Sequence, residues 1–224
     1  MTRLVLVNPN TSQASTDAMV AIGRQTGERD LSIEGVTAPF GAPLITDEDA
    51  LDEAARAVLS LAPRLRRTPC DGVIVAAFGD PGLSRLRDIL DVPVTGIAEA
   101  GMAAAAAGGR RFAVVTTTPG LIGVIEKAAS RYGHAALFAG TFLTEGDPVA
   151  LMAEPYALVN ALEAACKAAI RQGDAQAIVI GGGPLAPAAR ALAPTLGVAL
   201  IEPVPAAIRF AALRTAKAQP QGHA

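Results

Sequence analysis

The segment that decides the fold is Val73-Ile74-Val75-Ala76-Ala77-Phe78-Gly79-Asp80-Pro81-Gly82-Leu83. It begins as an apolar, β-branched run, which is typical of a buried strand, and then breaks into a glycine turn. Aspartate accepts hydrogen bonds from unpaired amides at a helix start, and proline suits the first helical turn. We therefore predict a strand, a turn, and a helix over residues 81–90 capped by Asp80. In α/β proteins, ligands usually bind at the carboxyl end of such a strand.

Three more segments repeat this arrangement of an apolar run followed by a polar or glycine-rich turn. They are Leu4-Val5-Leu6-Val7 before Asn8-Pro9-Asn10-Thr11-Ser12, Phe112-Ala113-Val114-Val115 before Thr116-Thr117-Thr118-Pro119-Gly120, and Ala177-Ile178-Val179-Ile180 before Gly181-Gly182-Gly183-Pro184-Leu185. The runs that start at 4 and 73 are 69 residues apart, and those that start at 112 and 177 are 65 apart. The similar spacing predicts two similar halves, each with two strand-end loops.

The segments between these runs alternate between helical and strand patterns. Further strands are expected at residues 31–37, 92–96, 136–139 and 198–201. Helices are expected at 14–27, 47–67, 97–107, 121–132, 148–172 with a kink at 154–155, and 185–192. A closing helix is expected to follow residues 202–205 and to end near residue 216. This alternation predicts an α/β protein with two lobes, each a short parallel four-stranded sheet flanked by helices. We place the first lobe at residues 1–98 plus 205–224 and the second at 99–204.

Composition excludes several classes of function. The chain has 224 residues, a net charge of −2 and no tryptophan, which argues against nucleic-acid binding. No apolar stretch approaches the length of a membrane span, and the first residues do not form a signal peptide. Two cysteines, Cys70 and Cys166, fit a reduced cytoplasmic protein, and neither they nor His134 and His223 have metal-ligand spacing. We predict a cytoplasmic protein without a metal site.

Several motifs together resemble the aspartate/glutamate/hydantoin racemase superfamily, and within it the hydantoin and allantoin racemase branch. They are Asn8-Pro9-Asn10-Thr11-Ser12, Phe78-Gly79-Asp80-Pro81-Gly82, Gly96-Ile97-Ala98-Glu99-Ala100 and Val115-Thr116-Thr117, with the glycines at 181–183 and Glu202-Pro203-Val204. The resemblance covers nearly the whole chain. It implies pseudo-symmetric lobes with an active site in the cleft between them, no cofactor, a small-molecule substrate and a homo-oligomer.

The resemblance also implies a mechanism that this chain cannot follow. Racemases of the family carry one cysteine at the end of the third strand and another in the matching loop of the second lobe. Inversion needs an acid and a base on opposite faces of the substrate carbon, and these two thiols serve as both. In this sequence those positions are Ala77 and Gly182. The changed surroundings of Gly182 favour a natural branch of the family over deliberate replacement.

The two cysteines present do not replace the missing pair. Cys70 precedes its predicted strand, at the end opposite the expected site, and Cys166 lies within a predicted helix. Both are interpreted as packing residues. If catalysis persists, a carboxylate near the cleft must carry the proton, and Asp80, Glu99 and Glu202 are the candidates. For Asp80, helix capping is the favoured interpretation, and for Glu99 and Glu202 a supporting contact is the alternative to catalysis.

The residues expected to bind substrate remain. Side chains of Asn8, Thr11 and Ser12 follow the first strand, and the hydroxyls of Thr116 and Thr117 follow the fifth. Backbone amides in two loops, Phe78 with Gly79 and Gly182 with Gly183, are predicted to hold a carboxylate or ring carbonyl and to stabilise an enolate. Helix capping is the plain structural alternative for Ser12.

Three functions fit these observations. The first is a hydantoin-racemase-like enzyme that acts at the α-carbon of a hydantoin, an amino acid or another small carboxylate. The second is a lyase, decarboxylase or ring-opening hydrolase that uses the same pocket. The third is a protein that binds such a ligand without transforming it.

Overall fold

A computed structural model describes residues 1–26, 30–182 and 185–218. The chain divides into two compact units. Unit 1 comprises Met1–Ile45, Asp49–Ile97 and Val204–Ala224, and unit 2 comprises Thr46–Glu48 and Ala98–Pro203. Each unit contains one four-stranded parallel sheet.

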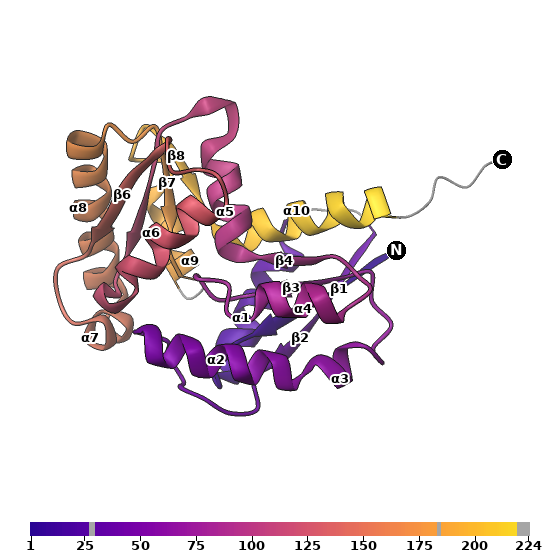
Figure 1. The fold of residues 1–224 in the computed structure, drawn as a ribbon. Coiled ribbons are helices and arrows are strands. Elements are labelled where there is room, and N and C mark those ends of the chain that lie inside the picture. The colour runs from indigo at the N-terminus through magenta and orange to yellow at the C-terminus, as the bar shows by residue number, and fades with distance from the viewer. Residues whose placement is uncertain (27–29, 183–184, 219–224) are drawn as a thin grey trace. The chain divides into compact units, whose positions relative to one another are not determined.

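The sheet of unit 1 has the strand order β2-β1-β3-β4, and all its pairings are parallel. Its strands are β1 (Thr2–Asn8), β2 (Leu31–Thr37), β3 (Gly72–Val75) and β4 (Val94–Gly96) (Figure 1). The central strands β1 and β3 are almost completely buried, which explains their uninterrupted apolar sequences.

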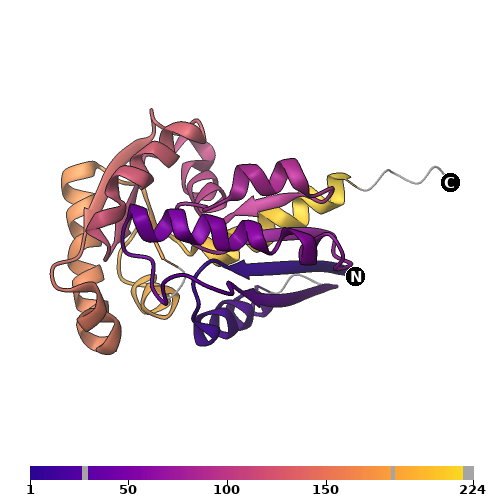
Figure 2. The ribbon, with the colours of Figure 1, turned by 60° about the horizontal axis from the view of Figure 1, so that its bottom comes forward.

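Helices cover both faces of this sheet. They are α1 (Gln13–Arg24), α2 (Glu48–Ser60), α3 (Ala62–Leu65), α4 (Leu83–Ile89) and α10 (Pro203–Ala218). Helices α1 and α2 lie on opposite sides of the sheet (Figure 2). Gly35 of β2 lets α1 approach closely, because a Cβ there would lie 2.7 Å from a methyl of Thr16 and 2.8 Å from one of Val20.

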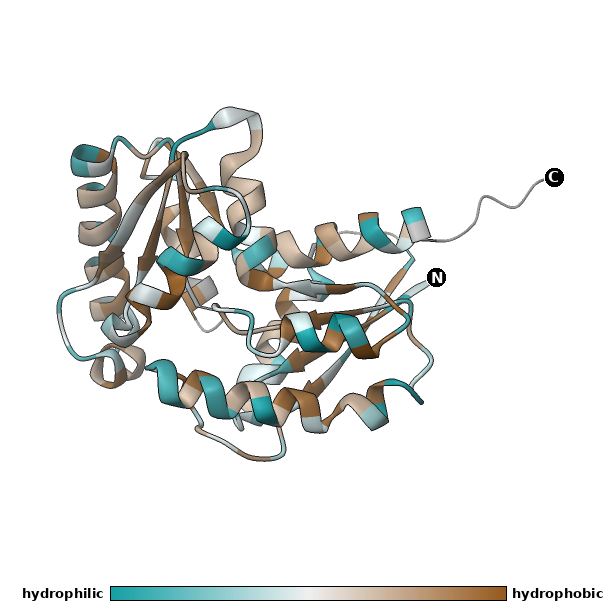
Figure 3. Ribbon diagram, viewed as in Figure 1, coloured by the Kyte–Doolittle hydropathy of each residue, from teal (hydrophilic) through white to brown (hydrophobic). Residues whose placement is uncertain are grey.

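The sheet of unit 2 has the same arrangement of strands as that of unit 1, with the order β6-β5-β7-β8 and parallel pairings throughout. Its strands are β5 (Phe112–Thr116), β6 (Phe138–Leu143), β7 (Ala177–Ile180) and β8 (Ala199–Ile201). The equal strand order confirms the predicted pair of similar four-stranded parallel sheets. In both sheets the strands are apolar, while the helices carry hydrophilic residues on one side (Figure 3).

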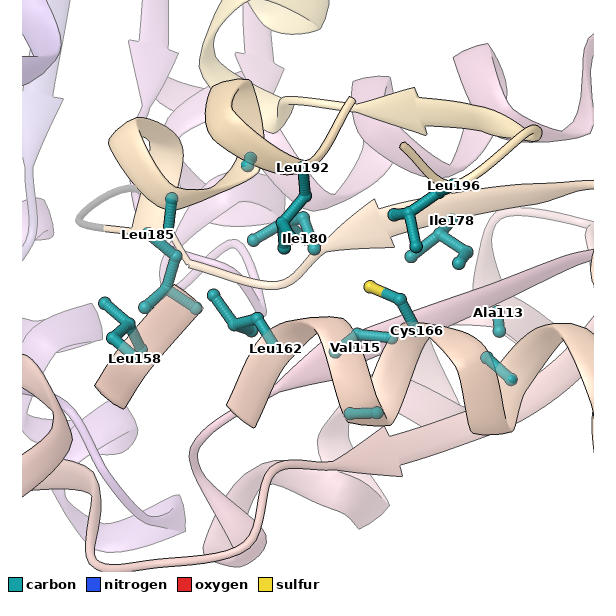
Figure 4. Close-up of a cluster of buried hydrophobic side chains, with 14 of the residues drawn as sticks. Ala113, Val115, Leu158, Leu162, Cys166, Ile178, Ile180, Leu185, Leu192 and Leu196 are labelled. Atoms are coloured by element: carbon teal, nitrogen blue, oxygen red, sulfur yellow. The ribbon is translucent and has the colours of Figure 1, made fainter. Parts of the chain in front are cut away.

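The helices of unit 2 are α5 (Ile97–Ala106), α6 (Ile122–Arg131), α7 (Pro148–Ala153), α8 (Pro155–Gly173) and α9 (Ala186–Leu192), with short 3-10 turns at Ala107–Gly109 and Pro119–Leu121. Helices α8 and α9 pack on one face of the sheet (Figure 4). There Leu162 and Cys166 of α8 meet Ile178 and Ile180 of β7 in a buried apolar cluster. Gly101 of α5 faces Val179, so α5 covers the opposite face.

Some of the predicted elements differ from the structure. The helix expected over 47–67 is divided into α2 and α3, because Pro63 has no N–H with which to continue the helical ladder. The strand expected at 136–139 begins at Phe138, because Leu137 and Phe138 both donate to the carbonyl of His134 in a turn. The helix expected from Pro81 begins at Leu83. Gly27, the expected end of the first helix, lies outside the described residues.

Within the described parts of the chain, no helix has the length and hydropathy needed to cross a membrane.

Candidate functional site

The loop after β1 is fixed by a buried amide side chain. The Nδ2 group of Asn8 donates to Asn10 Oδ1 (2.8 Å), to the Ser12 carbonyl (3.0 Å) and to Thr16 Oγ1 (3.0 Å). Its Oδ1 atom accepts from the Asn10 N–H (3.2 Å), and Asn8 is completely buried. Asn8 therefore shapes the loop, because its polar atoms are already used within the protein.

Ser12 and Thr11, the other two residues predicted to bind substrate from this loop, differ in their hydrogen bonding. Ser12 caps α1, since its hydroxyl accepts from the Ser15 N–H at 3.2 Å. Thr11 is half-buried, and its N–H donates to the Ala42 carbonyl at 3.1 Å. The Thr11 hydroxyl makes no hydrogen bond within the residues that the structure describes. Of the three side chains, Thr11 is the one whose polar atom is available to a ligand.

The loop after β3 has an unusual backbone. Gly79 has φ 115°, Asp80 has φ 52° and Gly82 has φ 75°, all in the region that favours glycine. Phe78, Gly79 and Asp80 are buried, whereas Ala77 is half-buried. Ala77 is therefore more exposed than the three residues that follow it.

Asp80 does not cap the helix that follows it. The N-cap of α4 is Gly82, and no side chain caps this helix. Instead the carboxyl group of Asp80 packs on Gly96, the last residue of β4: a Cβ at Gly96 would lie 2.2 Å from Asp80 Cγ. The backbone of Asp80 is left-handed, with φ 52°, and a sequence pattern cannot show this. The 96% buried carboxylate thus connects the ends of β3 and β4.

The loop after β5 is fixed by a buried threonine, as the loop after β1 is by Asn8. Thr116 Oγ1 donates to the Gly181 carbonyl at 3.0 Å and lies 2.9 Å from Thr118 Oγ1. Asn8, the last residue of β1, thus bonds to the side chain of Asn10. Thr116, the last residue of β5, bonds in the same way to the side chain of Thr118. Thr117 is 5% exposed, and its hydroxyl finds no partner within the described chain.

The glycine loop after β7 is described as far as Gly182. Gly181 is buried and its N–H donates to the Val115 carbonyl at 2.7 Å, while Gly182 is half-buried. Among the described residues, a Cβ at Gly182 would meet the Leu185 side chain, at 3.2 and 3.3 Å. The predicted contribution of Gly183 falls outside the described residues.

Glu202 follows β8 at the same edge of the sheet in unit 2. Its carboxylate accepts from Arg190 Nε of α9 at 2.9 Å, and the glutamate side chain is 22% exposed. The pair joins α9 to the end of β8. Glu99 lies in the first turn of α5 and is half-buried.

Neither cysteine lies at the carboxyl end of a strand. Cys70 precedes β3 and is half-buried, and burial together with the Asp71 charge raises the pKa of its thiol. The Cys166 sulfur points from α8 into the apolar cluster (Figure 4). Burial, assisted by the Glu163 carboxylate, raises the pKa of Cys166 to about 12. Both thiols are therefore protonated near neutral pH, and Cys166 is inaccessible.

His134 lies before β6, at the amino end of the sheet, where its ring meets Phe112 edge-on at 6.1 Å. It is remote from the strand-end loops along the strand direction. Across the described residues, no three His, Cys, Asp or Glu side chains gather as a metal site.

One residue at the polar edge of unit 2 was not predicted. Thr144 directly follows β6, and its N–H donates to the Thr116 carbonyl at 3.1 Å. The residue is 8% exposed, and β6 ends at Leu143, four residues after the predicted end of the strand at residue 139. The polar sequence around it carries no motif that would have identified it.

The strand-end loops thus define two sets of polar groups, one in each unit, on a racemase-type α/β fold. The Asp/Glu/hydantoin racemase family matches residues 4–211, and the chain belongs to this family. Its resemblance to that family is confirmed over almost the full sequence.

Individual relatives and solved structures show how similar the chain is to known proteins. The hydantoin racemase of Paenarthrobacter aurescens is 30% identical over 213 residues, which cover 93% of this chain and 89% of that protein. The structure of allantoin racemase from Klebsiella pneumoniae superposes with a TM-score of 0.91 at 30% identity, covering 99% of this chain and 92% of that one. Arylmalonate decarboxylase shares the fold at 18% identity, with a TM-score of 0.66.

Proposed function

We propose that this protein is a cofactor-independent enzyme of the hydantoin-racemase type. It moves a proton at the carbon next to a carbonyl in a hydantoin or a similar small cyclic amide. The observation that supports this proposal most concerns the hydrogen bonding of two side-chain hydroxyls, those of Thr11 and Thr117. Each hydroxyl has no partner among the described residues, and each lies on a loop held rigid by a buried neighbour, Asn8 or Thr116.

Such loops suit an imide ring. A hydantoin offers carbonyl oxygens and N–H groups, and a threonine hydroxyl can both donate and accept. Removal of the α-proton places negative charge on the adjacent carbonyl oxygen. The amides of Phe78 and Gly79 follow β3 and are suited to stabilise that charge as it develops.

Proton transfer in this proposal does not use thiols. We assign Ala77 and Gly182 to the positions where family racemases carry cysteines, and neither residue can hold a proton. Glu202 is the proposed acid–base group, because its carboxylate is partly exposed and it directly follows β8, the strand that pairs with β7. Asp80 is a positioning residue, because its carboxyl group is packed against Gly96.

The reaction is tested by NMR in D₂O with 5-methylhydantoin, allantoin and free amino acids. Racemisation exchanges the α-proton for deuterium above the rate without protein, and Glu202→Gln should lower this rate at least tenfold. A change in product mass would instead identify a lyase or hydrolase. A ligand that raises the Tm but is recovered without exchange would identify a binding protein.

The assembly and location are part of the same proposal. Relatedness to the family supports a homo-oligomer. Two free cysteines, one half-buried and one buried, fit a reducing cytoplasm. Light scattering on a size-exclusion column measures the oligomer, and a monomeric mass would contradict it.

A further inference from the structure

We propose that Thr144 is a substrate-binding residue, an inference that rests on the proposed function. Thr144 is 8% exposed and directly follows β6. Its Oγ1 atom is buried and has no hydrogen-bond partner among the described residues. The N–H of the same residue donates to Thr116, which places Thr144 beside the polar loop that carries Thr117.

The other buried hydroxyls at this edge show how the fold normally treats such groups. Thr116 and Thr118 bond to each other, and Thr116 also bonds to the Gly181 carbonyl. A buried hydroxyl without a partner is disfavoured, because folding removes its bonds to water and supplies none in return. A hydrogen-bonding group of the bound substrate would satisfy the Thr144 hydroxyl, and this explains why the position is a threonine. Rotation about the Cα–Cβ bond brings the hydroxyl to that partner.

The chemistry fits a cyclic amide. A hydroxyl donates to a carbonyl oxygen or accepts from a ring N–H, and both groups occur in a hydantoin. Valine has nearly the shape of threonine and lacks both capacities. Replacement of Thr144 by valine therefore removes the hydrogen bond while it keeps the packing.

The same strand provides a matched control. Thr141 of β6 also has a buried hydroxyl without a partner in the described chain. It pairs with Val114 inside the sheet, three positions before Thr144 and away from the strand end. Thr141→Val therefore makes the same chemical change at a position that the substrate does not reach.

The test compares Thr144→Val, Thr141→Val and Thr144→Ser with the unaltered enzyme. Neither valine variant loses a protein hydrogen bond, so each should keep its Tm or gain about 2–4 °C without ligand. Thr144→Val should raise the KM for 5-methylhydantoin or allantoin about tenfold, with a smaller change in kcat. Thr144→Ser should stay within about twofold of the unaltered enzyme, because it keeps the hydroxyl.

Two results would overturn the inference while the proposed function stands. One is a KM for Thr144→Val equal to that of Thr141→Val, in an enzyme that exchanges the α-proton. The other is a Tm for Thr144→Val several degrees below that of Thr141→Val, which would mean that the hydroxyl serves the fold. If the unaltered protein neither binds nor exchanges either compound, the proposed function fails and this inference fails with it.

Discussion

Replacement of Gly96 by alanine should break the contact that organises the loop after β3. An added Cβ would lie 2.2 Å from Asp80 Cγ, and 2.3 and 2.4 Å from its two carboxyl oxygens. Non-bonded carbon atoms normally approach to about 3.5 Å, so one group must move by roughly 1 Å. Asp80 has little room for this, because it is 4% exposed and its φ of 52° fixes the backbone.

The cost follows from these constraints. Overpacking a tight site costs about 1–3 kcal/mol, and displacement of a buried carboxyl group places this case at the upper end. We expect Gly96→Ala to lower the free energy of unfolding by about 3 kcal/mol. In a background with Asp80→Gly, which removes the carboxyl group and suits the positive φ, the same change should cost about 1 kcal/mol or less.

Urea unfolding followed by circular dichroism measures these values. Gly123→Ala, near the start of α6, is the control, because within the described residues a Cβ there would meet just one atom, Glu48 Oε1, at 3.4 Å. It should stay within about 0.5 kcal/mol of the unaltered protein. If Gly96→Ala costs no more than Gly123→Ala, or if Asp80→Gly does not relieve it, the proposed contact does not organise this loop.

Three further predictions concern single side chains. Because burial raises the pKa of Cys166 from 9.0 to about 12, the unfolded chain loses this proton first, so the free energy of unfolding should fall between about pH 9 and 12. Cys166→Ala should flatten that part of a pH series of denaturant titrations; an unchanged slope would contradict the assignment. Asn8→Ala should destabilise the protein by about 3 kcal/mol in urea, since three acceptors, two of them buried, lose their donor. Thr11→Val should leave the Tm within about 2 °C yet raise the KM about tenfold, and a lowered Tm with normal KM would reverse the roles given to these residues.

Much of the fold could be predicted because the central strands β1, β3, β5 and β7 are buried and apolar, and because turns mark the ends of several strands. Leu31–Thr37 and Ala177–Ile180 agree with the expected ranges, since flanking turns mark their ends. The strand β6 was misplaced because all its residues are only half-buried. Its apolar pattern is therefore weak, and Thr141 interrupts it.

The site was predictable as a set of loops but not as a set of contacts. The order of the loops along the chain follows from the repeated strand-and-turn pattern. The role of Asp80 depends on a backbone angle and on Gly96, which lies 16 residues further along the chain. Thr116 and Thr117 are adjacent and chemically equal, yet one serves the loop and the other has no partner in the described residues. Only tertiary structure separates such neighbours.

The central claim is that polar strand-end loops, and not thiols, provide the chemistry. The most direct test is deuterium exchange at the α-carbon of 5-methylhydantoin and allantoin by a variant without cysteine, carrying Cys70→Ser and Cys166→Ala. We predict that this variant keeps at least half of the exchange rate of the unaltered enzyme, and that adding Thr117→Val lowers the rate at least tenfold. Loss of exchange in the folded cysteine-free variant, or full exchange after Thr117→Val, would contradict the claim.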